Sequence, residues 1–93
     1  MTSEADIENA FVAYAESRGC EALKLRVDGQ NGFPDRTVLT PFGVIFIEFK
    51  RPKGRMSQAQ WRWRKVLQAL GFEVITTTSL RSAKKALEEF LRR

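Results

Sequence analysis

Three charged side chains, Asp35, Glu48 and Lys50, have the types and the spacing to do chemistry together. The apolar residues 44–47 lead directly into Glu48 and are typical of a buried strand. Because alternate residues of a strand point to the same side, Glu48 and Lys50 share one face and Phe49 points the other way, into the core. If Asp35 lies alongside, two carboxylates converge, and such a pair favours a hard cation such as Mg²⁺ or Mn²⁺. The lysine could then orient or activate a water molecule.

The same residues also have purely structural explanations. Asp35 could be a turn residue whose carboxylate caps its own backbone. Glu48 and Lys50 could form an ion pair at the end of an exposed strand. However, Phe46 lies on the same strand face as Glu48, so that face is partly apolar. Burial of charge costs several kcal/mol unless the charge is paired or bound to metal, which favours a functional interpretation.

A wider pattern surrounds these residues. The pentad Gly-x-Pro-Asp-Arg at residues 32–36, followed by Glu-Phe-Lys at residues 48–50, resembles the VRR-NUC family of the PD-(D/E)xK nuclease superfamily, in particular its small stand-alone phage-type members. A Ser-x-x-Gln at residues 57–60 has the family's spacing, and the resemblance covers nearly the whole chain. It implies a metal-dependent DNA endonuclease that hydrolyses phosphodiester bonds. The phage-type relatives also imply a homodimer that cuts branched DNA such as four-way (Holliday) junctions.

The resemblance gives the matching residues specific roles. Asp35 and Glu48 would bind Mg²⁺ or Mn²⁺, with the backbone carbonyl of Phe49 as a third oxygen ligand. Lys50 would position the attacking water and offset negative charge in the transition state. Because two adjacent carboxylates stabilise its ammonium form, we expect Lys50 to position the water rather than to act as the general base.

Two further positions follow from the same resemblance. The superfamily places an acidic residue of the first helix near the metal; Glu8 is the better match and Glu4 the reserve, although either could be a solvent-facing glutamate. Gln60 lies ten residues after Lys50 and would approach the lysine and the scissile phosphate. Alternatively, Gln60 forms a capping box with Ser57, which needs no substrate. The two roles of Gln60 are compatible.

Composition limits the class of protein. The 93 residues are 43% hydrophobic, which predicts one small domain over residues 1–93 without a separate target-recognition domain. The chain has no histidine and one cysteine, Cys20, which excludes His-based catalysis, an intramolecular disulfide and a multi-cysteine zinc site. The N-terminal residues lack a signal-peptide core, and no apolar run is long enough to span a bilayer. We therefore expect a soluble cytoplasmic protein, encoded by a bacterial host or a phage.

Charge is distributed unevenly along the chain. Residues 1–49 have a net charge of −4 and residues 50–93 a net charge of +9, and residues 50–65 contain seven basic side chains and no acid. Trp61 and Trp63 are interleaved with these bases and cannot both face the core, so the segment predicts a phosphate-contacting surface with a stacking group. A solvated helix face is the alternative, and a non-catalytic nucleic-acid-binding module is the rival function. The predicted nucleic-acid contacts are Arg36, Arg51, Lys53, Arg55 and Arg62.

The pattern of apolar residues, caps and turns predicts the element order αβββαβα. We expect helices over residues 3–18, capped by Thr2 or Ser3, over residues 57–70, and from residue 79 onwards. We expect strands over residues 22–27, 36–39, 44–50 and 72–77. The second and third strands should form a hairpin, and the helix before the fourth permits a parallel crossover. The predicted fold class is α/β: a mixed sheet flanked by helices, like a restriction-endonuclease core.

Overall fold

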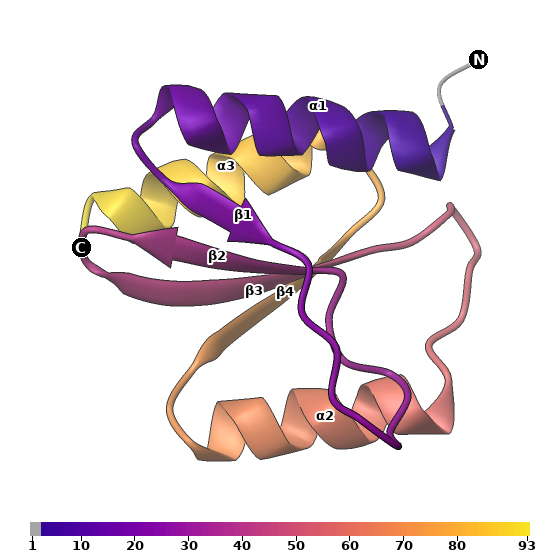
Figure 1. The fold of residues 1–93 in the computed structure, drawn as a ribbon. Helices are drawn as coiled ribbons and strands as arrows, with labels where there is room; N and C mark the ends of the chain where they lie inside the picture. Colours follow the sequence, from indigo (N-terminus) through magenta and orange to yellow (C-terminus); the bar gives the residue numbers. More distant parts are fainter. Residues whose placement is uncertain (1–2) are drawn as a thin grey trace.

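The computed structural model describes residues 3–93, which form the predicted α/β order (Figure 1). The elements are α1 (Glu4–Ser17), β1 (Glu21–Leu23), β2 (Arg36–Thr40), β3 (Gly43–Phe49), α2 (Gln58–Ala69), β4 (Glu73–Thr77) and α3 (Leu80–Leu91). No helix within residues 3–93 is long and apolar enough to cross a membrane.

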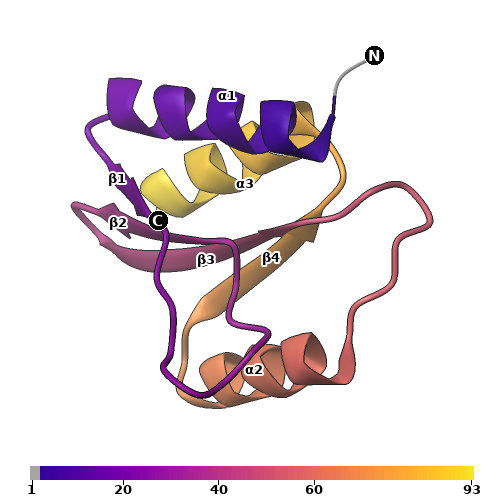
Figure 2. The same ribbon diagram turned by 45° about the vertical axis from the view of Figure 1, so that its right-hand side comes forward.

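The four strands lie in the order β1-β2-β3-β4 and form one mixed sheet. β1, β2 and β3 pair in antiparallel fashion, and β4 pairs parallel to β3 after the α2 crossover. Helices α1 and α3 cover one face of the sheet, and α2 covers the other (Figures 1 and 2). The predicted hairpin and the predicted parallel crossover are both confirmed.

Strand β3 is the centre of the molecule and contributes to both cores. Ile45, Ile47 and Phe49 are buried in the core beneath α1 and α3, where the Phe49 ring centroid lies 5.7 Å from that of Phe11. Phe46 belongs to the second core, under α2. The period-2 alternation of the strand therefore places Glu48 on the α2 side, opposite Phe49, as the sequence predicts.

Each helix begins after a serine cap. The Ser3, Ser57 and Ser79 side chains accept hydrogen bonds from backbone N–H groups in the first turns of α1, α2 and α3. These bonds satisfy donors that have no partner within the helix. Thr2, the other predicted cap of α1, lies outside the described residues.

The first strand differs from its prediction over residues 22–27. It ends at Leu23, opposite Thr37, because its partner β2 begins at Arg36. A longer β1 would lie opposite Asp35 and Pro34; the Asp35 N–H donates to Glu48 Oε1, and proline has no N–H to donate. Ala22 packs in the core, whereas Leu25, beyond the end of the strand, is exposed.

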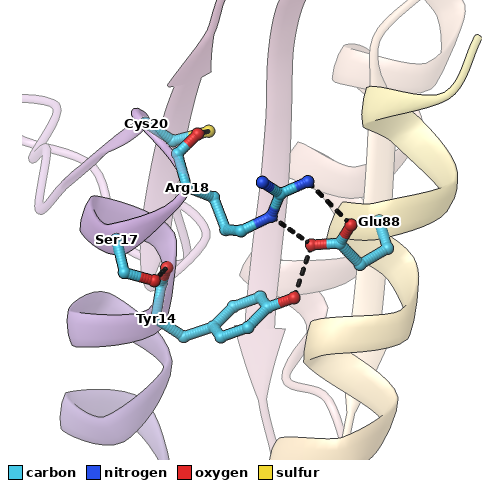
Figure 3. A network of polar contacts seen from close by, with 5 residues as sticks. All are labelled: Tyr14, Ser17, Arg18, Cys20 and Glu88. Carbon is cyan, nitrogen blue, oxygen red and sulfur yellow. Dashed lines mark hydrogen bonds and ion pairs between the residues drawn. The ribbon is translucent and has the colours of Figure 1, made fainter.

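A polar network joins the two helices that cover the same face (Figure 3). Arg18, at the end of α1, donates two hydrogen bonds to the Glu88 carboxylate of α3, at 2.7 and 3.0 Å. The hydroxyl of Tyr14 donates to the same carboxylate. The hydrogen bonds from Arg18 and Tyr14 lower the pKa of Glu88 to about 2. The network fixes α3 against α1 at the edge of the core.

Candidate active site

Asp35 and Glu48 meet where the β2–β3 ladder ends. The last pair of the ladder is Arg36 with Ile47. Beyond it, side chains take over the pairing: the Asp35 N–H donates to Glu48 Oε1 at 3.1 Å, and the Phe49 N–H donates to Asp35 Oδ2 at 2.7 Å. These two reciprocal bonds fix both carboxylates at one end of the sheet, so the structure brings the two predicted metal ligands together.

The Glu48 side chain is buried, with 3% of the residue exposed. Burial and, next, the neighbouring Asp35 carboxylate raise the pKa of Glu48 to about 8, while Lys50 acts in the opposite direction. A buried carboxylate held against a second one is unfavourable without compensating positive charge. The site therefore has the electrostatic character of a cation-binding centre, and an exposed Glu48–Lys50 pair does not describe it.

Gln60 connects the two ends of this charged cluster. Its Oε1 accepts hydrogen bonds from Lys50 Nζ and from the Ser57 N–H, both at 2.8 Å. Its Nε2 donates to Glu48 Oε2 at 2.7 Å. The Ser57 hydroxyl in turn accepts from the Gln60 N–H at 3.1 Å, which completes a capping box. Gln60 therefore caps α2 and contacts Lys50 with the same side chain.

The start of α2 is held in place by the loop that precedes Asp35. Gly32 has φ +88°, and a Cβ atom there would lie 2.4 Å from the Ala59 carbonyl carbon and 2.6 Å from the Gln60 nitrogen. Only glycine permits both this backbone conformation and this close approach. The first residue of the Gly-x-Pro-Asp-Arg pentad thus positions Gln60, a role that the sequence pattern alone does not reveal.

The two acids of α1 lie in different surroundings. Glu8 Oε2 accepts from Arg36 Nε at 2.7 Å and lies 3.5 Å from Lys24 Nζ. Glu4 lies 3.9 Å from Arg51 and lines the hollow that Lys50 also lines. Within residues 3–93, no three acidic, histidine or cysteine side chains gather into a metal-binding group. Neither glutamate therefore joins Asp35 and Glu48, although Glu4, the reserve candidate, lines the same hollow as Lys50.

The five predicted basic contacts differ in their surroundings, and Arg62 is exposed on α2, where it donates to Gln30 Oε1 at 3.2 Å. Arg51, Lys53 and Arg55 are exposed and line a hollow of about 430 Å³ together with Lys50. Arg36 differs from the expectation: its side chain is 16% exposed and donates to Glu8 and, at 3.2 Å, to the Ala22 carbonyl. The predicted Arg36 contact with nucleic acid would require this internal ion pair to open.

The two tryptophans of α2 point to different sides of the helix, and Arg64 of the same helix lies near the site, a placement that was not predicted from the sequence. Trp63 packs inside, with its ring centroid 5.1 Å from that of Phe33, whereas Trp61 is exposed. Arg64 lines a small hollow together with Glu48 and Gln60, and its guanidinium donates to Thr76 Oγ1 at 2.7 Å. The signal available in the sequence was spacing, because residues four apart share one face of a helix.

Comparison with solved structures shows which known fold this chain shares. The fold is similar to a solved structure described as a "VRR_NUC domain", with a TM-score of 0.84, 26% sequence identity, and coverage of 95% of this chain and 97% of the other. The fold of this chain is therefore that of a VRR-NUC-type domain. No family model matches its sequence, and no curated protein does. The VRR-NUC resemblance predicted from residues 32–36 and 48–50 is confirmed at the level of the whole fold, which is that of a nuclease-like domain.

Proposed function

We propose that this VRR-NUC domain is an Mg²⁺- or Mn²⁺-dependent DNA endonuclease. The observation that carries the proposal is the convergence of Asp35, Glu48, Lys50 and Gln60 at one end of the sheet. Non-catalytic binding of a polyanion gains nothing from two carboxylates facing it, whereas metal-assisted hydrolysis of a phosphodiester requires them.

The donor set fits a hard divalent cation. Glu48 accepts one hydrogen bond at each oxygen and Asp35 accepts one at Oδ2. A carboxylate offers about four acceptor positions, so both residues retain lone pairs for a cation. With the Phe49 carbonyl, and with Glu4 or Glu8 as a further acid, all candidate ligands are oxygens, which suits Mg²⁺ and Mn²⁺. When bound, such an ion supplies Lewis-acid polarisation of the phosphate and lowers the pKa of water.

The residues of the chain divide the remaining work. The Lys50 ammonium, held by Gln60 Oε1, orients the attacking water and offsets the negative charge that develops on the phosphate. Gln60 also fixes Glu48, so one amide sets the distance between the lysine and the acid. Because Gly32 fixes the start of α2, the whole set is held before substrate arrives, which reduces the reorganisation needed in the transition state.

DNA is the proposed substrate, held by its backbone. The exposed residues Arg51, Lys53 and Arg55 flank Lys50 and can contact phosphates on either side of the scissile bond, with Arg62 further along α2. Such contacts read the shape of the backbone and not the base sequence, which supports selectivity for branched DNA such as a four-way junction. Two-fold pairing of the domain would match the symmetry of that substrate and supply its two cuts.

A cleavage panel tests the proposal. Junction, flap, nicked, linear duplex and single-stranded DNA are incubated with the protein in Mg²⁺, in Mn²⁺, in Ca²⁺ and in EDTA. We expect cutting in Mg²⁺ and Mn²⁺, fastest on branched DNA, none in EDTA, and binding without efficient cutting in Ca²⁺, whose looser geometry positions water poorly. Undiminished cutting in EDTA would exclude the metal, and binding without cutting in every condition would favour the non-catalytic module.

A further inference from the structure

The outer face of α2 carries an exposed aromatic ring in a basic setting. Trp61 is 49% exposed. It lines an open hollow of about 750 Å³ with Arg62, Lys65 and two other residues of the helix. Burial of a tryptophan is strongly favourable, so an exposed one on an ordered helix marks a surface that gains by contact with a partner.

The charge of this surface limits the kind of partner. Helix α2 carries Arg62, Arg64 and Lys65 and has no acidic residue. The Arg64 guanidinium lies 5.9 Å from the centroid of the Trp61 ring and holds Thr76 by a hydrogen bond. The ring is therefore set among fixed positive charges, which suit a polyanion. Contact with the same face of a second copy would oppose like charges, which disfavours a symmetric protein interface here.

The surface is continuous with the candidate active site. Trp61 follows Gln60 in the chain, and Gln60 bonds both Glu48 and Lys50. Arg64 lies against Trp61 on one side and lines the small hollow beside Glu48 on the other. Gln60 and Arg64 thus connect the Trp61 face of α2 to the side chains proposed to act on the phosphate.

We propose that Trp61 stacks on an unpaired base of a single-stranded DNA segment next to the cleaved phosphodiester, while Arg62 and Lys65 contact the backbone of that segment. The inference rests on the proposed nuclease function, since it names the part of the substrate that this face of α2 holds. Stacking on a flat aromatic ring accepts every base, because each base has a π face. The surface therefore recognises the absence of pairing and not a sequence.

Binding of fluorescein-labelled oligothymidine in EDTA tests this directly, because no cleavage is needed. Trp61→Ala should weaken binding by roughly 5- to 100-fold, the usual effect of losing one stacked base. Trp61→Phe, which keeps a ring, should restore most of the affinity. Leu70→Ala is the matched control, since Leu70 is exposed on the cap of the same helix, 69% accessible, with no ring to stack. It should bind like the wild type.

Three further readouts decide between stacking and its alternatives. Oligothymidine should quench the tryptophan emission of the wild type much more than that of Trp61→Ala, which retains only the half-buried Trp63. Arg62→Ala should reduce the salt dependence of binding, and Trp61→Ala should not, because stacking releases no counterions.

Equal affinities for wild type and Trp61→Ala would overturn the proposal. So would a change of molecular mass in Trp61→Ala, which would place this face between two copies. If the wild type binds oligothymidine through Trp61 but cuts no DNA, the stacking proposal stands and only the nuclease function is contradicted.

Discussion

The Gln60 carboxamide both caps α2 and contacts Lys50 and Glu48, and mutation can separate these two roles. Ser57→Ala removes the hydroxyl that caps α2 but leaves the contacts of Gln60 to Lys50 and Glu48. It should cost about 1 kcal/mol of unfolding free energy and keep the cleavage rate. Gln60→Ala should cost a similar amount of stability and also lower the cleavage rate by about 10- to 100-fold, as loss of a residue that orients metal ligands does.

Urea unfolding and initial cleavage rates of the two variants give the comparison. Equal activity of Ser57→Ala and Gln60→Ala, at equal stability, would show that the glutamine acts as a helix cap alone.

Gly32 offers a second test at the scale of one residue, with a matched control in the same loop. Gly29 has φ +73° and open space where a Cβ would lie, whereas a Cβ at Gly32 would lie 2.4 Å from the α2 backbone. Gly29→Ala should cost only the left-handed backbone penalty, about 1–2 kcal/mol. Gly32→Ala should cost that amount plus about 1–3 kcal/mol for the overlap, measured by chemical unfolding. Equal losses of unfolding free energy in the two variants would contradict the close packing of Gly32 against the start of α2.

Sequence spacing predicted which way a side chain points where this depends on one strand alone. Glu48, Phe49 and Lys50 alternate across β3, so their opposite faces could be predicted before the fold was known. The Arg36–Glu8 ion pair could not be predicted in this way. It joins residues 28 positions apart, and their contact depends on how α1 lies over the sheet.

At the scale of elements, the junction of α1 with α3 predicts a dependence on pH. Glu88 has a pKa lowered to about 2 by its hydrogen bonds to Arg18 and Tyr14. A lowered carboxyl pKa means that the contact stabilises the fold above the ordinary pKa of glutamate and is lost as pH falls towards 2. We expect the wild type to unfold at a higher temperature than Glu88→Gln at pH 6, and the difference to shrink between about pH 4.5 and 2.

Thermal unfolding of both proteins across that pH range measures the effect. A difference that stays constant down to pH 2 would show that the Glu88 charge does not contribute to the junction.

The elements themselves were predictable from periodicity and caps, with one informative exception. Ser57 with Gln60 predicts the start of α2 because the capping box is local. The end of β1 is not local, because it depends on where the pairing with β2 stops, at Leu23 opposite Thr37, and the predicted strand over residues 22–27 does not reveal that point.

At the scale of the whole molecule, exposed aromatic surface supports the proposed homodimer. Phe33 packs edge-on against Phe46 and Trp63 and so contributes little to such a surface. Phe42 remains 64% exposed and Phe72 39% exposed. We expect light scattering at micromolar concentration to give about twice the 10.7 kDa mass of one chain. A mass near 10.7 kDa would contradict the dimer, and we would then expect single-strand nicks in place of paired cuts.

Asp35 and Glu48 are the residues proposed to hold the divalent ion that hydrolysis needs. Glu48→Gln tests it most directly, because the amide keeps the size of the side chain and removes its charge. On the DNA that the wild type cuts fastest, in Mg²⁺, we expect this variant to cut at least about 100-fold more slowly while still binding that DNA in EDTA. Cutting by Glu48→Gln at the wild-type rate would contradict the account.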